Sequence, residues 1–309
     1  MTALAESPAT GADVICAGLV HIYPGEDAPI VALRNLDLEV GAGEMLALLG
    51  PSGSGKSTLL AVLSGLLRPT AGKVLVAGHD MARLDEGGIS RLRATELALL
   101  LQDPLENLVP YATALENLAF TQRGSRRRGW PLRWPPDELV ETFDLGPIAS
   151  RPVHQLSGGE QQKVAMACAV ATSPRVLVAD EPTSNLDPVA RTSVIEGLRR
   201  AHEFSGATII VATHDAMTAA HFTRTLTISH GVIGSEGRGG RRFAVVGRDG
   251  SIQLPPEVAA LYPAGSLFRV VLTDSAVELR PEADAEAASA ADSSDSSGAT
   301  GDEMPWEEE

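Results

Sequence analysis

The sequence predicts an α/β fold built around a parallel β-sheet that is covered on both faces. Two short apolar runs, RVLVADEP at 175–182 and ATIIVATHD at 207–215, have β-branched residues at their centres and end in acidic residues. Continuous apolar runs of this length are typical of strands buried between two layers. Helix-like runs alternate with the strand-like ones along the chain, which is the pattern of successive βαβ units.

The elements predicted before residue 120 begin with three strand-like segments within 13–50, which read DVICAGLVHIY, PIVALRNLDLEV and MLALLG. A helix-like run, STLLAVLSGLL, starts at Ser57 and stops at the RPT sequence of 68–70. The segment GKVLVAGHD then predicts another strand, and residues 88–120 have a helical or mixed pattern.

The segment TQRGSRRRGWPLRWPP at 121–136 predicts a loop, because glycine and proline break the pattern, and PDELVETFDL resumes as a helix. The sequence GSEGRGG at 234–240 predicts a flexible joint, with a linker at 236–240. Residues 241–280 predict a small β-rich module around the helix-like PPEVAALY. The tail at 281–309 contains mainly Ala, Ser, Asp and Glu, so we expect it to be disordered.

Composition limits the possible functions of this chain of 309 residues with 44% hydrophobic residues and a net charge of −15. Ten acidic residues and no basic ones lie from 281 onward, which leaves −5 for residues 1–280. A mildly acidic body argues against a protein that mainly grips nucleic acid. The two cysteines form no metal spacing, the N-terminus lacks a basic signal region, and no apolar run is long enough to span a bilayer. Any membrane span must therefore come from another chain.

The segment Gly50-Pro51-Ser52-Gly53-Ser54-Gly55-Lys56-Ser57 is a complete G-x-x-x-x-G-K-[ST] phosphate-binding loop. A strand precedes it and a helix follows it, as the motif requires. We expect backbone N–H groups and the helix start to hold phosphates, Lys56 to reach the β- and γ-phosphates, and Ser57 to hold Mg²⁺. The predicted ATP-binding residues are Gly50, Ser52, Gly53, Ser54, Gly55, Lys56, Ser57 and Thr58.

Two carboxylates, Asp180 and Glu181, follow a buried strand directly. The carboxyl ends of strands are where open α/β sheets bind ligands. Beside a phosphate-binding loop, Asp180 is suited to orienting Mg²⁺, and Glu181 is suited to polarising an attacking water.

The segment LSGGEQQ at 156–162 starts a helix with two glycines, although glycine weakens helices. The spacing of Ser157 and Glu160 predicts a capping box. Gly158 and Gly159 then leave the backbone N–H groups open to a phosphate, or they merely form a turn.

These motifs resemble those of the ATP-binding-cassette (ABC) ATPases, P-loop NTPases, over residues 13–235. The resemblance includes Gln102 (Q-loop), the signature 156–161, the D-loop from Ser184 to Asp187 and the switch residue His214, all in the family's order. It implies a nucleotide-binding domain with a mixed sheet, an antiparallel β subdomain and a helical subdomain at about 88–160. It also implies that Tyr23 stacks on adenine, that Gln102 senses Mg²⁺ and nucleotide, and that His214 holds the attacking water with Glu181.

In this family the signature helix faces the γ-phosphate that a second subunit binds. The resemblance therefore implies that Ser157, Gly158, Gly159, Glu160 and Asp187 act on the ATP of a partner, either a second copy or a homologous cassette. Cys168 stands where the family often has arginine, and we interpret it as a packing residue, not a reactive thiol.

The segment from Asn107 to Asn117 is most similar to the subfamily that pairs with lipoprotein-releasing, macrolide-exporting and division-linked permeases. This similarity implies an ATPase at the inner, cytoplasmic face of the cell membrane that drives an integral-membrane permease of unstated cargo. The alternatives are a soluble cassette ATPase and an ATP-gated DNA-binding regulator, because residues 243–280 weakly resemble swapped-hairpin β-modules. Few basic residues there make DNA binding the weaker hypothesis. The predicted loop at 121–136 is a basic insertion that also contains Trp130 and Trp134. It is either a solvated loop or a surface that contacts lipid headgroups or the permease. Its arginines are Arg123, Arg126, Arg127, Arg128 and Arg133.

Overall fold

The computed structural model describes residues 13–25, 28–132, 134–184, 186–247, 250–254, 258, 260–262, 265–273 and 277–281. The predicted tail lies outside the described residues apart from Pro281, and so do Arg133 and Asn185. The chain divides into two compact units, with the boundary after Gln253. None of the described helices is both long and apolar enough to cross a bilayer.

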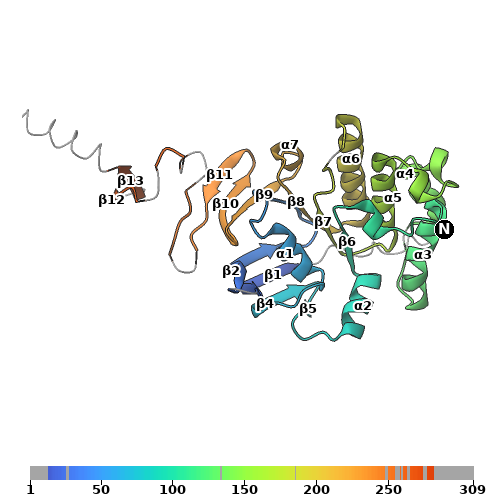
Figure 1. The fold of residues 1–309 in the computed structure, drawn as a ribbon, viewed down its shortest axis with the longest axis horizontal. Coiled ribbons are helices and arrows are strands. Elements are labelled where there is room, and N and C mark those ends of the chain that lie inside the picture. Colours follow the sequence, from blue (N-terminus) through green and yellow to red (C-terminus); the bar gives the residue numbers. More distant parts are fainter. Residues whose placement is uncertain are drawn as a thin grey trace, which may run out of the picture. The chain divides into compact units, whose positions relative to one another are not determined.

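A mixed seven-stranded sheet forms the centre of the first unit (Figure 1). Its order is β11-β10-β9-β3-β8-β7-β6, and the five strands from β9 to β6 are parallel. β7 and β8 carry the two apolar runs of the sequence and are buried, as predicted. The strand bounds are β3 Met45–Leu49, β6 Leu97–Leu100, β7 Val176–Asp180, β8 Thr208–Thr213, β9 Arg224–Ser229, β10 Val232–Arg238 and β11 Arg241–Ala244.

A second, antiparallel sheet of order β2-β1-β4-β5 packs against one face of the central sheet, with helix α1 (Lys56–Leu63) between them. Leu59, Leu60 and Leu63 of α1 are fully or almost fully buried in the shared core. This packing fixes the start of α1 beside the end of β3. The strands are β1 Val14–Tyr23, β2 Ile30–Val40, β4 Ala71–Val76 and β5 His79–Asp80.

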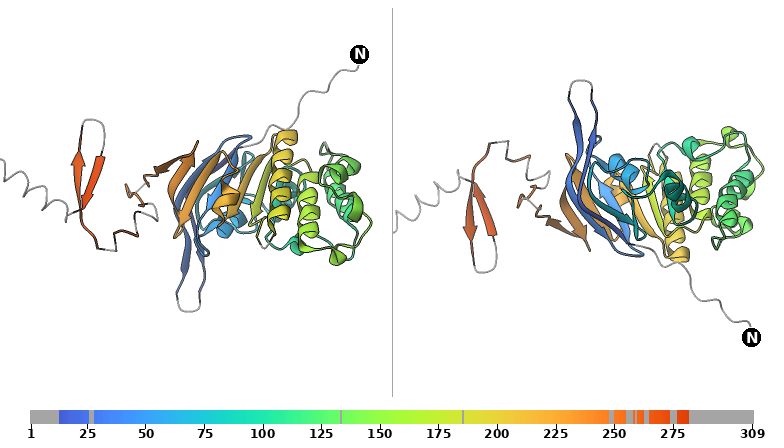
Figure 2. Two further views of the ribbon diagram at one scale, coloured as in Figure 1. Left: turned by 90° about the horizontal axis from the view of Figure 1, so that it is seen from above. Right: turned by 90° about the horizontal axis from the view of Figure 1, so that it is seen from below.

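Helices cover the other face of the central sheet and extend beyond it. Figure 2 shows the green and yellow helices of residues 114–205 gathered at one end of the unit. Their apolar side chains join those of β6, β7 and β8 in a second core cluster. The helices on this side are α3 Ala114–Arg127, α4 Pro136–Thr142, α5 Gly158–Ala171, α6 Pro188–Ser205 and α7 Ala216–Ala219, with short 3₁₀ turns at Pro104–Asn107 (η1), Gly146–Ile148 (η2) and Val153–Gln155 (η3). Helix α2 (Glu86–Thr95) instead packs Leu92 into the core cluster shared with α1.

The predicted loop at 121–136 is wrong in its first half, because α3 continues through Arg127. A capping box of Thr113 and Glu116 starts this helix. Buried Gln122 then ties its far end down, since Gln122 Nε2 donates to the backbone oxygens of Trp134 at 2.6 Å and Ala171 at 3.2 Å. Trp134 is only 3% exposed, and the half-buried Trp130 donates from Nε1 to Thr172 O at 3.0 Å.

The predicted flexible linker at 236–240 is also wrong, because β10 and β11 form a hairpin through it. Gly237 pairs with Arg242, and Arg238 pairs with Arg241 across the ladder. The Arg224 guanidinium pairs with Glu236 at 2.9 Å and with Glu44 at 3.2 Å, which joins β10 to β9 and to the turn before β3. These ion pairs and ladder bonds make 236–240 part of the first unit.

The second unit contains one antiparallel strand pair among its described residues, and it begins later than the module predicted at 241–280, because residues 241–253 belong to the first unit. β12 (Phe268–Leu272) pairs antiparallel with β13 (Val277–Pro281). The rings of Tyr262 and Phe268 pack edge to face with their centroids 4.8 Å apart. Half of the predicted helix at 255–262, residues 255–257 and 259, lies outside the described residues.

Both cysteines are buried packing residues, as the sequence suggests for Cys168. Burial raises the pKa of each thiol to about 12. At pH 8 only about one thiol in ten thousand would be ionised, and the thiolate is the reactive form. We therefore expect Ellman's reagent to label neither cysteine of the folded chain and both cysteines after unfolding in guanidinium. Rapid labelling of the folded chain would contradict this assignment.

Candidate active site at the carboxyl edge of the central sheet

The phosphate-binding loop joins the end of β3 to the start of α1. Two glycines are required by close approach: a Cβ on Gly50 would lie 2.3 Å from Ile228 O, and one on Gly55 would lie 2.7 Å from Ala32 O. Lys56 is 6% exposed, and its Nζ donates to Gly50 O at 2.8 Å and to Pro51 O at 3.0 Å. The ammonium thus stabilises the curled loop before any phosphate is bound.

Asp180 and Ser57 form a site whose chemistry fits Mg²⁺. Asp180 ends β7, and its Oδ1 is buried without a hydrogen-bond partner. Burial raises the pKa of this carboxyl, and the charge of Glu181 adds to the rise, whereas a hydrogen bond from Ser57 and the charge of Lys56 oppose it. A hard divalent cation prefers oxygen ligands such as this carboxylate and hydroxyl, together with phosphate oxygens.

Glu181 and His214 are in direct contact beside the loop. The His214 ring nitrogen Nδ1 lies 3.0 Å from Glu181 Oε1. Because a carboxylate only accepts hydrogen bonds, Nδ1 is the donor, and Nε2 takes no part in this contact. Glu181 has φ +45°, a left-handed conformation that is uncommon for a residue with a side chain, and its N–H donates to Ala212 O at 2.9 Å. Strained backbone of this kind is typical of functional sites.

The loop after β8 holds His214 in place. Asp215 caps α7 by accepting from Met217 N at 2.9 Å, and it pairs with Arg191 of α6 at 3.2 Å. The His214 side chain remains 62% exposed while Glu181 is 11% exposed. A ligand can therefore reach the His214 side chain more easily than the carboxylate of Glu181, which is mostly buried.

Tyr23 lies at the other end of the cleft. Its hydroxyl is 3.2 Å from Thr58 Oγ1, and its ring packs edge to face on His21 with centroids 4.7 Å apart. His21 is itself 7% exposed and its Nδ1 lies 3.0 Å from Arg68 O. The tyrosine that the sequence assigns to adenine is thus held against the start of α1.

One cleft of about 580 Å³ brings most of the predicted site together. Arg34 and His230 also line it, and the sequence analysis missed both, since neither belongs to a motif. Hydrogen bonds explain their place: Arg34 N donates to Gly231 O at 3.0 Å, and Gly231 N donates to Ser54 O at 2.9 Å. The predicted residues that line the cleft are Tyr23, Ser52, Gly53, Ser54, Gly55, Lys56, Ser57, Thr58, Gln102, Glu181 and His214.

The capping box predicted at the start of α5 is confirmed. Ser157 N donates to Glu160 Oε2 at 2.7 Å, and Glu160 N donates to Ser157 Oγ at 3.4 Å. Ser157 Oγ also donates to Glu160 Oε2 at 2.9 Å. The two bonds that Ser157 donates to this carboxylate lower the pKa of Glu160, the backbone N–H having the largest effect. A Cβ on Gly158 would meet nothing within 4 Å, whereas one on Gly159 would approach Ala190 Cβ to 3.2 Å. The start of α5 is therefore unobstructed at Gly158.

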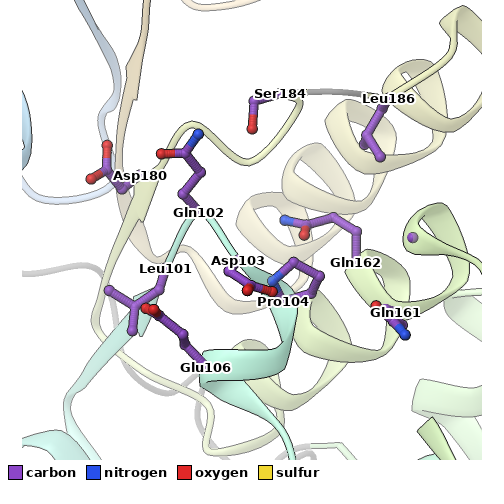
Figure 3. A pocket seen from close by; sticks show the side chains of 11 residues that line it. Leu101, Gln102, Asp103, Pro104, Glu106, Gln161, Gln162, Asp180, Ser184 and Leu186 are labelled. Carbon is purple, nitrogen blue, oxygen red and sulfur yellow. The ribbon is translucent and has the colours of Figure 1, made fainter. Parts of the chain in front are cut away.

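Gly158 borders a second hollow of about 570 Å³, distinct from the cleft that the phosphate-binding loop lines. Figure 3 shows Gln102 and Ser184 reaching this hollow from one side and Gln162 of α5 from the other. Gln102 lines both hollows, and Asp180 lines only the second. Ser157, Gly159, Glu160 and Asp187 line neither. Asp187 instead caps α6 by accepting from Val189 N and Ala190 N, both at 2.9 Å.

A family model described as ABC transporter matches residues 33–184. The lipoprotein-releasing system ATP-binding protein LolD of Anaeromyxobacter dehalogenans (strain 2CP-C) is 42% identical over 212 residues, which cover 68% of this chain and 88% of that protein. The macrolide export ATP-binding/permease protein MacB of Rhodopseudomonas palustris (strain BisB18) is 37% identical over 220 residues, which cover 71% of this chain and 33% of that protein.

The fold is also similar to that of solved ATP-binding cassettes. The dimeric post-hydrolysis structure of the cassette MJ0796 bound to ADP and Pi aligns with a TM-score of 0.65 and 33% identity, covering 74% of this chain and all of that one. Another dimeric structure of MJ0796 aligns with a TM-score of 0.66 and 29% identity over the same share of this chain. With its motifs and their geometry, the chain therefore belongs to the ABC transporter family, as an ATP-binding protein that hydrolyses ATP.

Proposed function

We propose that this chain is one half of a cassette pair in which each ATP is held between the phosphate-binding loop of one protomer and the α5 start of the other. The observation that supports it is the separation of the two halves within one chain. The open backbone of Gly158 faces a hollow that the loop from Gly50 to Ser57 does not line. A helix start with free N–H groups binds an anion, and a second copy can supply that anion.

Within each half of the shared site, each residue contacts a different part of the nucleotide or its metal ion. Lys56 and the loop backbone hold the β- and γ-phosphates, and Tyr23 holds the base. Ser57, Asp180 and Gln102 would hold Mg²⁺, which would neutralise phosphate charge when bound. Glu181 accepts a proton from the attacking water, and His214, held in place by its bond to Glu181, contacts the γ-phosphate. Ser157, Glu160 and Asp187 complete the site from the partner.

The work of hydrolysis is delivered to a separate integral-membrane permease. Relatives named for lipoprotein release and for macrolide export support this assignment. A cassette with this role acts on the cytoplasmic side, at the inner face of the cell membrane. The pair consists of two copies of this chain or of one copy and a homologous cassette.

Mixing two inactive variants tests whether the site is shared. Glu181→Gln disables the half-site with the phosphate-binding loop, and Ser157→Arg blocks the open helix start. We expect each variant alone to lack ATPase activity. Their mixture should regain activity, about a quarter of the wild-type rate for random pairing, because half of the dimers are then mixed and each mixed dimer has one intact site.

The comparison that decides the outcome is the mixture against each variant alone. A chain that carries both changes serves as the control, since no pairing of its copies has an intact site. A mixture that stays inactive while both variants bind ATP as monomers would overturn the shared site.

A further inference from the structure

The adjoining ends of α2 and α3 carry a concentration of positive charge that the ATPase site does not use. The two helix ends lie side by side, because Ser125 Oγ donates to Ala94 O at 2.6 Å and a Cβ on Gly124 would lie 3.8 Å from Ala94 Cβ. Six exposed arginines surround this contact in a chain whose net charge is −15. This arginine face consists of Arg91, Arg93, Arg123, Arg126, Arg127 and Arg128.

Within the described part of the chain, no carboxylate lies within ion-pair distance of any arginine of this face. Arg126 donates to the neutral Gln122 Oε1 at 3.1 Å, and Arg128 donates to Gly124 O at 3.2 Å. The exposed arginines of α6 differ, since Arg199 and Arg200 both pair with Glu196 at 3.4 Å. The arginine face therefore retains its positive charge.

An exposed aromatic residue lies among these arginines. Phe120 is 64% exposed and precedes Arg123 by three residues and Arg127 by seven. At 100° per residue this spacing places all three on one face of α3, opposite the buried Leu118, Gln122 and Ser125. An apolar side chain surrounded by arginines matches the composition of a helix that lies on a membrane surface.

We propose that the arginine face and Phe120 bind the anionic headgroups of a phospholipid bilayer. The guanidinium groups spread around the outer surface of a helix end, so they suit an extended layer of phosphates better than one small anion. Clusters of four to eight arginines or lysines attract anionic leaflets, each contributing near the surface. Phe120 would enter the boundary between headgroups and acyl chains. This inference rests on the proposed function in one respect, because a permease partner would bring the chain to a membrane.

The one acidic residue on this face of α3 is already engaged. Glu116 lies one turn before Phe120 and accepts from Thr113 N at 2.8 Å and from Thr113 Oγ1 at 3.0 Å. It is thus held at the start of the helix, about 10 Å along the axis from Arg123 at 1.5 Å per residue. That separation is about one Debye length at moderate salt, so Glu116 scarcely weakens the attraction.

Flotation of the purified full-length chain with vesicles tests the proposal, without permease or ATP. We expect binding to vesicles that contain phosphatidylglycerol, little binding to phosphatidylcholine alone, and loss of binding as salt rises. Arg123→Gln, Arg127→Gln and Arg128→Gln together should lower the apparent partition coefficient by about tenfold or more. Phe120→Ser should lower it by about three- to tenfold, since it removes the buried apolar contact.

A matched control carries Arg83→Gln, Arg199→Gln and Arg200→Gln, which removes the same charge from other exposed positions. It should bind vesicles within about twofold of the wild type. Equal losses in both triple variants, or equal binding to neutral and anionic vesicles, would overturn the proposal. Binding of the chain to vesicles only when a permease is present would also overturn it. So would a result in which the Arg123, Arg127 and Arg128 substitutions weaken binding to duplex DNA more than binding to vesicles. Because no nucleotide is present, these outcomes are independent of the shared-site test.

Discussion

Replacing Glu181 with glutamine is expected to reduce ATP turnover by about 100-fold or more while leaving ATP binding intact. Glutamine keeps the shape of the side chain and can still contact His214 Nδ1, which lies 3.0 Å from Glu181 Oε1. It cannot accept the proton of the attacking water. Dimers that form on ATP should therefore accumulate, because hydrolysis normally ends their lifetime.

Steady-state phosphate release and light scattering after gel filtration measure the two effects. Glu203→Gln removes the same charge at an exposed position of α6, and it should leave turnover and mass unchanged. A Glu181→Gln chain with normal turnover would show that another group accepts the proton. A chain that binds ATP but stays monomeric would argue against the cassette pair.

Replacing Lys56 with methionine should weaken ATP binding by about 10- to 150-fold, as expected for the loss of a hydrogen-bonded charge. The side chain is 6% exposed and occupies the centre of the loop, bonded to Gly50 O and Pro51 O. Methionine fills nearly the same space without the ammonium. The weakening should be larger for ATP and ADP than for AMP, because Lys56 is assigned to the β- and γ-phosphates.

Equilibrium titration with fluorescent nucleotides measures the change, and thermal unfolding of the free chain separates it from a loss of stability. Lys73→Met, on the exposed start of β4, is the control and should bind ATP normally. Equal weakening for all three nucleotides would place Lys56 away from the phosphates and contradict its assigned role.

The sequence predicts the backbone of the candidate site well wherever local rules determine it. The phosphate-binding loop needs glycine at Gly50 and Gly55 because backbone atoms approach there, and the capping box needs Ser157 and Glu160 at a spacing of three. Such features depend on neighbours in the chain. The same is true of β7 and β8, whose apolar runs are long enough to mark buried strands.

The sequence predictions are wrong where distant contacts decide the structure. Residues 121–127 contain glycine and arginines that suggest a loop, yet Gln122 is anchored to Ala171 from a helix 49 residues later. Residues 236–240 contain three glycines, yet Arg224 and the partner strand hold them in a sheet. For the same reason Arg34 and His230 carried no signal, since the contacts that bring them to the cleft join separate strands.

The closed capping box at the start of α5 has a consequence for the speed of assembly. Ser157 and Glu160 satisfy each other within a single chain, and the lowered pKa of Glu160 keeps its carboxylate ionised into mildly acidic solution. The helix tip is thus preorganised before a partner arrives, so little conformational entropy is lost when it docks. Association of two loaded protomers should then be limited by collision and orientation, with no slower ordering step at this edge.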